Sequence, residues 1–473
     1  MIEKARTIYG SLEYVVRFNG ETTDTFRVLA GILIGDPASP VLWILIISDF
    51  HPHPHKDDVF LGGIRISHLW LADDGILVCL SAAGVQSNLS DFDRFRSRRF
   101  LNVSVPKTAA SIFGELPPAL PPLELNGGRV NYVSTYVYTG TAFSTTTRDM
   151  FADHYARRAA SAEKIAHASF SLQAYTGTLP PQVALTLYRA RVEPHLTFGC
   201  EVALDVHAPS YERLEKVQNV FLRRALGLGG HSQLIPLFSE TGVKPIRYRR
   251  LELALRFAQY ALQPNAPAYV AAALHEAHAL ATAGHPSWWS DLYRALAALP
   301  VPVALPIHAD LTPHLLADIA RSLDSSLAAH IHASVVSSHR LPILAARFAF
   351  LPSQPPVLQA LCKWRAYLNV PFAPHREALV RLLVSDHKLA VEALRRVSPQ
   401  VPRHRRICRL CEVRSAIESE LHVLLECRNE QLCAIRDAFY ARILPRLPKL
   451  PRLVDSTPPL ILPDDNALLD LQA

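Results

Sequence analysis

Two adjacent carboxylates are the first residues of this sequence whose type and setting could do chemistry. Asp73 and Asp74 lie between two segments with alternating apolar residues, residues 64–71 before them and residues 76–80 after them. Such segments around an Asp-Gly step predict a β-hairpin. Carboxylates on a rigid hairpin are the hard oxygen ligands that Mg²⁺ needs for phosphoryl chemistry. We therefore expect a Mg²⁺ site at Asp73 and Asp74.

A second group of residues has the spacing of a zinc site. The pattern Cys408-x2-Cys411-x10-His422-x4-Cys427 supplies three thiols and one imidazole. Two cysteines two residues apart suit a tight knuckle, and His422 and Cys427 are about one helical turn apart, so all four side chains could converge tetrahedrally on Zn²⁺. The alternative is a set of buried cysteines without metal. Because the pattern leaves no open coordination position, the predicted zinc is structural and not catalytic.

Basic side chains surround this cysteine and histidine pattern. They are Arg403, Arg405, Arg406, Arg409 and Arg414. A basic knuckle suits single-stranded nucleic acid, because arginines pair with phosphates along the strand. The sequence therefore predicts a knuckle that binds nucleic acid.

The composition is that of a folded, modestly basic protein. The 473 residues are 49% hydrophobic and carry 49 basic against 42 acidic side chains, a net charge of +7 that is compatible with a nucleic-acid partner. The first residues lack the apolar region of a secretory signal. The most apolar stretch, residues 28–47, is interrupted by Asp36, Pro37 and Pro40. We expect a nuclear or cytoplasmic protein that is neither secreted nor membrane-spanning.

The elements that must position the two aspartates are predicted to be a mixture of strands and helices. Strand-like patterns cover residues 13–18, 25–33, 64–80 and 133–138. One helix is expected after Ser39-Pro40, with residues 41–47 pointing inward. Another helix is expected over residues 84–100. Its aromatic and arginine side chains could bind nucleic-acid bases by stacking, but we prefer the interpretation that Leu89, Phe92 and Phe95 form a buried stripe of this helix. Asp57-Asp58 has no strand pattern beside it and is expected at the surface.

From about residue 145 the pattern becomes helical. Apolar residues recur at helical spacing from Leu214 to Ala225 and stop at Gly227, and another helix is expected from near Pro245 to residue 262. Residues 264–400 predict short helices joined by tight loops. The tail from Pro445 is expected to be poorly ordered.

Four segments of the first part resemble, in order, the palm motifs of reverse transcriptases of non-LTR (LINE-type) retrotransposons. Leu71-Ala72-Asp73-Asp74 resembles the family's Tyr/Phe-Ala-Asp-Asp motif, and residues 31–40 resemble its Gly-x-x-Gln-Gly-Asp-Pro-Leu-Ser-Pro motif, with Leu33 and Ile34 in place of the family's Arg and Gln. Leu101-Asn102-Val103 with Lys107-Thr108 is similar to Leu-x-x-Asn-x-x-Lys-Thr. Residues 136–140 are similar to the Phe-x-Tyr-Leu-Gly hairpin.

The resemblance continues beyond the palm. Residues 187–201 are similar to the family's thumb segment, and residues 214–218 and 221–224 fit the thumb helix that follows. Residues 418–427 resemble the Glu-Thr-x-x-His-x-Leu-x-x-Cys finger found C-terminal to the reverse transcriptase of these elements. The arrangement implied is an α+β protein with a partial palm sheet, followed by a mainly α-helical thumb and C-terminal region. Its expected parts are a truncated palm (1–144), a thumb-like region (145–263), a helical connector (264–400), a CCHC zinc knuckle (401–440) and a tail (441–473).

The family also implies roles for individual residues. Asp73 and Asp74 would hold Mg²⁺ for nucleotidyl transfer, and Lys107 would screen or protonate the leaving pyrophosphate. Residues implied to contact template, primer end or nucleotide are Gly35, Asp36, Pro37, Ser39, Tyr136 and Gly140. The implied partners are an RNA template and a DNA primer.

The number of residues before these motifs limits the expected activity. In the family a bridging aspartate comes from a strand well before the Gly-Asp-Pro motif, but only thirty residues precede Gly31 here. We therefore expect the fingers and the first catalytic strand to be absent, and the chain to be inactive as an RNA-directed DNA polymerase on its own while retaining nucleic-acid binding. The alternatives are an active polymerase subunit whose N-terminal part is supplied elsewhere, and the product of a non-functional pseudogene.

Overall fold

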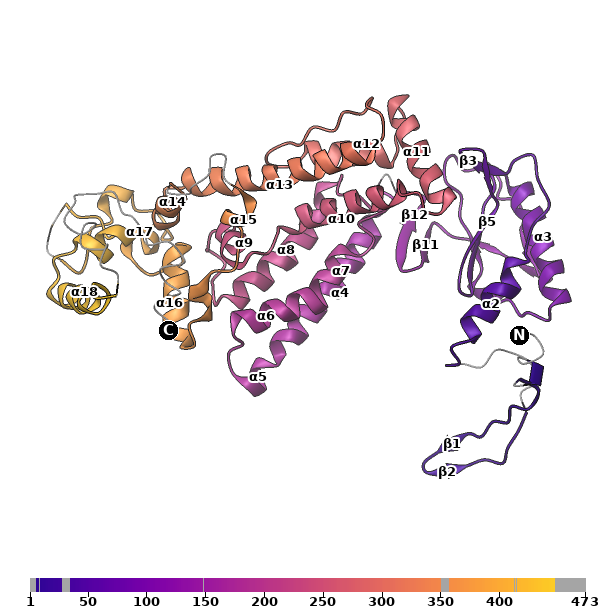
Figure 1. Ribbon diagram of the computed structural model, residues 1–473, viewed down its shortest axis with the longest axis horizontal. Coiled ribbons are helices and arrows are strands. Elements are labelled where there is room, and N and C mark those ends of the chain that lie inside the picture. Colours follow the sequence, from indigo (N-terminus) through magenta and orange to yellow (C-terminus); the bar gives the residue numbers. More distant parts are fainter. Residues whose placement is uncertain are drawn as a thin grey trace. The chain divides into compact units, whose positions relative to one another are not determined.

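The chain divides into two compact units, Met1–Gly140 and Thr141–Ala473, which are described separately. The computed structural model describes residues 6–7, 9–27, 35–147, 149–349, 357–411, 413 and 415–446. Gly31, Leu33, Ile34 and Arg414 lie outside the described residues, as does the tail from residue 447. The described chain combines many helices with small two-stranded sheets, as expected of an α+β protein (Figure 1).

The first unit consists of short strands and two longer helices. The helices are α2 (Ser39–Ser48), α3 (Ala82–Arg98) and the single turn η1 (Val105–Lys107). The strands are β1 (Arg17–Phe18), β2 (Glu21–Thr22), β3 (Val59–Leu61), β4 (Ile64–Ile66), β5 (His68–Leu71), β6 (Asp74–Leu77), β7 (Ala109–Ala110), β8 (Glu124–Leu125), β9 (Gly128–Arg129), β10 (Asn131–Tyr132) and β11 (Thr135–Tyr138). The described strands of this unit that pair with one another do so only in twos: β1–β2, β3–β4, β5–β6 and β8–β9 antiparallel, and β7–β10 parallel.

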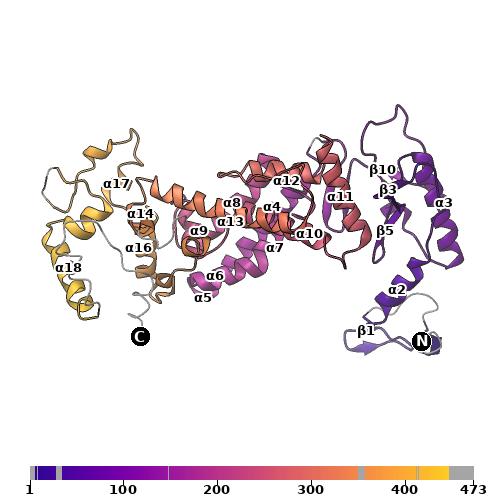
Figure 2. The ribbon, with the colours of Figure 1, turned by 45° about the horizontal axis from the view of Figure 1, so that its top comes forward.

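The α3 helix supports the strands of the first unit (Figures 1 and 2). Its N-cap Ser81 accepts a hydrogen bond from the Gly84 amide, which satisfies a free N–H of the first turn. Leu89 and Phe95 are buried and Phe92 is half-buried, so the predicted apolar stripe is confirmed. Phe92 and Phe95 form edge contacts with Phe50, with ring centroids 5.3 and 5.2 Å apart. This aromatic cluster joins α3 to the end of α2.

Two expectations about the first unit are wrong. The apolar face of α2 does not point inward as a whole: Ile47 is buried, but Val41, Ile44 and Leu45 are more than half exposed, because only the side near Phe50 has packing partners in this unit. Asp58 is buried rather than at the surface. The guanidinium of Arg65 and the amide of His55 both bind its Oδ2, at 2.5 and 2.8 Å, and compensate the charge.

The second unit begins with β12 (Thr141–Ser144) and is otherwise helical. Its first helices are α4 (Ala152–Ser171), α5 (Gln173–Thr176), α6 (Pro181–Leu187), η2 (Tyr188–Val192), α7 (Glu193–Thr197), α8 (Ala208–Ala225), α9 (Ile235–Thr241) and α10 (Ile246–Ala261). They continue with α11 (Ala268–Thr282), α12 (Trp288–Ala297), α13 (Pro313–Val336), α14 (Pro342–Ala349), α15 (Leu358–Leu361), η3 (Ala366–Asn369), α16 (Ala373–Leu383) and α17 (Ala390–Ala393). The last are η4 (Arg403–Arg405), η5 (His422–Glu426) and α18 (Glu430–Ile443).

One hydrophobic core runs through the helices of the second unit, from Tyr155 on α4 to Val384 after α16. The helices α4, α8, α10 and α13 pack in sequence against one another (Figure 1). The predicted helices near residues 214–225 and 245–262 are confirmed as α8 and α10. The expectation of only short helices after residue 264 is wrong for α13, which has 24 residues. The boundary expected at residues 263/264 falls inside this continuous core.

Candidate metal centre

The four residues of the Cys-Cys-His-Cys pattern come together in the second unit. Cys408, Cys411, His422 and Cys427 are all buried, and their ligand atoms lie within 4.8 Å of one another. The Sγ atoms of Cys408 and Cys427 are 3.9 Å apart, and the Sγ of Cys411 is 3.4 Å from Nε2 of His422. Among the described residues no other group of three or more His, Cys, Asp or Glu side chains converges in this way.

These separations fit a tetrahedral zinc ion. Zn–S bonds of about 2.3 Å and Zn–N bonds of about 2.0 Å, set at tetrahedral angles, place two sulfurs about 3.8 Å apart and a sulfur and a nitrogen about 3.6 Å apart. Both values are close to the observed separations. The four side chains could therefore hold a metal such as zinc. All four positions would be filled by protein, so the metal would fix the fold and would not activate water.

The backbone around the ligands is folded to bring the four side chains inward. The Cys408 amide donates to the Ala416 carbonyl at 2.7 Å, and the Leu410 amide points at the Cys408 sulfur at 3.4 Å. The Cys427 amide donates to the His422 carbonyl at 2.7 Å, which closes η5 as a π-helical turn. The four-residue gap between His422 and Cys427 thus matches a π turn rather than the α-helical turn suggested by the spacing.

The metal-free thiols differ in acidity. The backbone N–H of Val413 lowers the pKa of Cys411 to about 7, with help from His422 and the other two thiols and against the effect of burial. Burial raises the pKa of Cys427 to about 11. Zinc binds thiolates, so metal binding at neutral pH would release protons from this cluster, including the proton of Cys427.

A buried carboxylate attaches the knuckle to the rest of the unit. Glu418 is 1% exposed and accepts hydrogen bonds from the backbone and guanidinium of Arg409 and from the Ala390 amide at the start of α17. Burial by itself would raise the pKa of Glu418, but these hydrogen bonds lower it. Glu418 therefore connects the loop that carries Cys408 and Cys411 to the start of α17.

Two of the arginines expected to face nucleic acid have partners within the protein. Arg406 is buried and donates to the carbonyls of Val401 and Val391, at 2.9 and 2.6 Å, so the expectation that it contacts a ligand is wrong. Arg409 pairs with Glu418, but its side chain is 62% exposed, so its contact with nucleic acid stays a prediction.

The exposed face of the knuckle is both basic and apolar. Arg403, Arg405 and Arg428 are exposed, and within the described part of the chain none of them forms an ion pair. Large apolar side chains are also between 39 and 43% exposed here: Ile407, Leu410, Val413, Leu424 and Leu425. These five residues were not predicted from the sequence. Their exposure could have been predicted from their position next to the cysteine and histidine residues, because side chains that neighbour inward-pointing residues tend to point outward.

The expected Mg²⁺ residues lie in the first unit, on the hairpin formed by β5 and β6. The hairpin is confirmed, but its register differs from the expectation: Leu71 pairs with Asp74 and Trp70 with Gly75. The two-residue turn is Ala72-Asp73, with Ala72 at φ +54°, so the Asp-Gly step lies in the strand. Both carboxylates are exposed, and among the described residues no third donor joins them to form a metal-binding group.

Parts of two other family-like motifs lie next to this hairpin. The Trp43 indole of α2 donates to the Ala72 carbonyl at 2.5 Å. Burial and the nearby charge of Asp74 raise the pKa of Tyr138 on β11. Helix α2 therefore contacts the turn of the aspartate hairpin, and Asp74 acts electrostatically on Tyr138.

The remaining expected residues of the first unit are not all brought to the aspartates. Asp36 forms the turn that opens α2: its Oδ1 accepts from the Ala38 amide, and the Tyr9 hydroxyl contacts both Asp36 and Ser39. Gly35, at φ +88°, and exposed Pro37 flank Asp36. Lys107 ends η1 and is exposed, and no ion pair in the described chain links it to either aspartate. Tyr136 is 40% exposed on β11, and Gly140 follows that strand at φ +83°.

Neither a family model nor a curated protein matches the chain significantly. None of the described helices has both the length and the apolar character needed to cross a bilayer. The function therefore has to be inferred from the chain's own residues.

Proposed function

We propose that this chain binds single-stranded nucleic acid through a zinc-stabilised knuckle, and that it belongs to the lineage of non-LTR retrotransposon reverse transcriptases. The observation that carries the binding proposal is the buried Cys408, Cys411, His422 and Cys427 cluster in a segment that also has exposed arginines and aliphatic side chains. The lineage proposal rests on the motif resemblance and on the contact of α2 with the aspartate hairpin.

The two kinds of exposed side chain suit the two parts of a single strand. Unpaired arginines such as Arg403, Arg405 and Arg428 can follow the phosphates. Exposed aliphatic side chains such as Leu410 and Leu424 offer apolar surface against which unstacked bases can pack, and bases in a single strand are free to do so. A duplex hides its base faces and would use only the arginines. The surface therefore favours single strands.

The binding proposal is tested by fluorescence anisotropy with a labelled 20-nucleotide single-stranded RNA at several salt concentrations. Arg403→Gln/Arg405→Gln should weaken binding and reduce the slope of log K against log salt by about 1.4, or about 0.7 for each phosphate that no longer pairs with an arginine. Arg294→Gln/Arg321→Gln is the matched control, because it removes the same charge from arginines that pair with Asp291 and Asp318. An unchanged slope in the knuckle variant, or equal weakening in both variants, would contradict the proposal.

A second candidate function is nucleotidyl transfer at Asp73 and Asp74. It is favoured by the contact between Trp43 of α2 and the Ala72 carbonyl in the turn that carries Asp73. Primer extension on an RNA template with Mg²⁺ separates the two candidates. Synthesis that is abolished in Asp73→Ala would establish a polymerase. Equal incorporation by the variant and the unmodified chain, or none by either, would leave binding as the function of this chain.

A further inference from the structure

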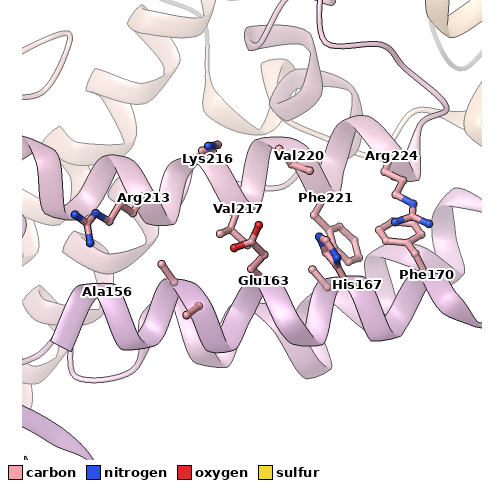
Figure 3. Close-up of a pocket in the computed structure, with 13 residues that line it drawn as sticks. Ala156, Glu163, His167, Phe170, Arg213, Lys216, Val217, Val220, Phe221 and Arg224 are labelled. Atoms are coloured by element: carbon pink, nitrogen blue, oxygen red, sulfur yellow. The ribbon is translucent and has the colours of Figure 1, made fainter. Parts of the chain in front are cut away.

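A groove runs between α4 and α8 in the second unit, and neither the knuckle nor the aspartate hairpin contributes to it. Figure 3 shows the two helices side by side and parallel, with Ala156 opposite Arg213 at one end and Phe170 opposite Arg224 at the other. The cavity between them has a volume of about 290 Å³. Its floor is apolar: Ala156, Ala160, Val217 and Val220 are partly or largely exposed, whereas Phe170 and Phe221 are buried.

One wall of the groove is positively charged. Arg213, Lys216 and Arg224 are exposed on α8 at spacings of three and eight residues, which places them on one side of the helix. Arg224 lies over the Phe170 ring, 4.4 Å from its centroid. Within the described part of the chain, Arg213 and Lys216 form no ion pair. The opposite wall contributes Glu163 and His167 (Figure 3), so the basic groups outnumber the single carboxylate.

This combination suits an occupant that is apolar on one side and acidic on another. A nucleic-acid backbone would pair with the cations but would leave the exposed Ala160 and Val220 side chains against water. An acidic segment with several leucines covers both surfaces, because its carboxylates meet the α8 wall while its aliphatic side chains fill the floor.

The chain contains one segment of this kind beyond the described residues. Residues 453–473 hold four aspartates, Asp455, Asp464, Asp465 and Asp470, and no lysine or arginine. The whole chain has a net charge of +7. Because residues 453–473 have a net charge of −4, the other residues together have a net charge of +11. The same segment contains eight leucine, isoleucine and valine residues. It is opposite in charge to the groove and has the apolar side chains that the groove floor requires.

We propose that residues 453–473 of this chain dock in the groove between α4 and α8. The groove and the end of α18 belong to the same unit. Asp464 lies 18 residues after Arg446, the last described residue, and an extended chain of that length spans up to about 60 Å. Docking would cover the apolar floor and neutralise the cations of α8, and nucleic acid would then be excluded from this face.

Site-specific photocross-linking in the full-length chain tests the proposal. A benzoylphenylalanine in place of Leu468 should cross-link within the same molecule to peptides from α4 or α8. Arg213→Glu/Lys216→Glu should reduce the yield about fivefold, because two attractive contacts at the groove become repulsive. Asp464→Lys/Asp465→Lys added to that variant should restore the yield. Arg189→Glu/Arg191→Glu is the charge-matched control, since both arginines are exposed on η2 outside the groove, and it should have no effect.

Several outcomes would overturn the proposal. They are cross-links that map to other helices, cross-links that join two copies of the chain, and a yield that is the same in Arg213→Glu/Lys216→Glu. A single-stranded RNA that protects Lys216 from acetylation, while Leu468 cross-links elsewhere, would show that nucleic acid occupies the groove instead. None of these readouts depends on the knuckle, so failure here is distinguishable from failure of the proposed binding function.

Discussion

The ring of Trp70 lies directly over Gly75, its cross-strand partner in the aspartate hairpin. A Cβ on Gly75 would collide with the ring atoms of Trp70. Trp70 in turn lies 5.4 Å from Phe92 and 6.2 Å from Phe50, measured between ring centroids. The glycine is thus required by packing, because the ring must sit flat on the strand to reach the aromatic cluster of α3.

Replacing this glycine should therefore destabilise the first unit. We expect Gly75→Ala to lower the free energy of unfolding by about 1–3 kcal/mol, the usual effect of overpacking a fitted contact. The measurement is urea denaturation followed by tryptophan fluorescence. Gly10→Ala is the control, because a Cβ at Gly10 meets nothing within 4 Å. Equal stability of Gly75→Ala and the unmodified chain would show that Trp70 does not rest on this glycine.

At the scale of single residues, the sequence predicted what depends on local spacing. The zinc ligands and the aspartate hairpin follow from short intervals along the chain, and the structure brings both sets together as local groups. The roles of Arg406 and Arg409 could not be predicted, because Arg406 reaches Val391 only when α17 packs against the knuckle, and Arg409 reaches Glu418 only when the knuckle loop is folded. The burial of Asp58 likewise depends on Arg65 from a neighbouring strand.

At the scale of elements, a buried ion pair connects α4, the loop before α8 and α10. Arg250 on α10 donates to Asp205 at 2.8 Å, to the Tyr155 hydroxyl at 2.9 Å and to the Leu196 carbonyl at 2.8 Å. Arg250 and Asp205 are both only 3% exposed. Because each of the three guanidinium nitrogens has a hydrogen-bond acceptor, the charges are tolerated inside the core.

Removing one member of this pair should be severe. Arg250→Met is expected to cost about 3–5 kcal/mol of unfolding free energy, because it leaves the Asp205 carboxylate buried without its cation. Thermal unfolding of the full chain is the measurement. Arg256→Met, on the same helix, removes an exposed arginine that pairs with Glu252 and should change the melting temperature little. Similar effects of the two variants would argue against a buried network.

A second buried carboxylate makes the stability of the helical unit depend on pH. Glu240 on α9 is buried beside Arg347, Arg365 and Tyr367. Burial alone would raise its pKa, but the two guanidinium groups and the Tyr367 hydrogen bond outweigh burial and lower it. A carboxyl group whose pKa is lowered by folding stabilises the fold above its ordinary pKa, and this stabilisation is lost as the pH falls through the lowered value.

Glu240→Gln should therefore be less stable than the unmodified chain at pH 7, and the difference should shrink below about pH 4. Melting temperatures measured from pH 7 to pH 3 provide the test. Glu276→Gln, at an exposed position of α11, serves as the control and should follow the unmodified chain throughout. A gap between Glu240→Gln and the unmodified chain that stays constant down to pH 3 would contradict a lowered pKa for Glu240.

The elements themselves were largely predictable from the sequence where packing follows one helix face. Helices α3, α8 and α10 have regular apolar spacing and end at caps or glycines. Helix α2 was predicted in position but not in burial, because its apolar residues surround the whole helix and periodicity cannot select a face. The length of α13 was missed, because its alanines and histidines give little contrast between its faces.

At the scale of the whole molecule, the chain separates its two candidate sites into different units. The aspartate hairpin belongs to the first unit, and the knuckle is attached to the large helical core of the second through Glu418 and Arg406. The sequence predicted two regions of different character but could not show that the core continues without a break from α4 to α16. That continuity depends on contacts between helices far apart in the chain.

The central claim, that a zinc-held knuckle binds single-stranded nucleic acid, is tested most directly by measuring RNA affinity as zinc is removed and restored. We predict about one zinc per chain in protein purified under reducing conditions. We also predict that a chelator weakens binding of a single-stranded RNA several-fold, that added zinc restores binding, and that Cys408→Ser binds weakly whether or not a chelator is present. RNA affinity that is the same with and without zinc, or purified protein without zinc, would contradict the claim.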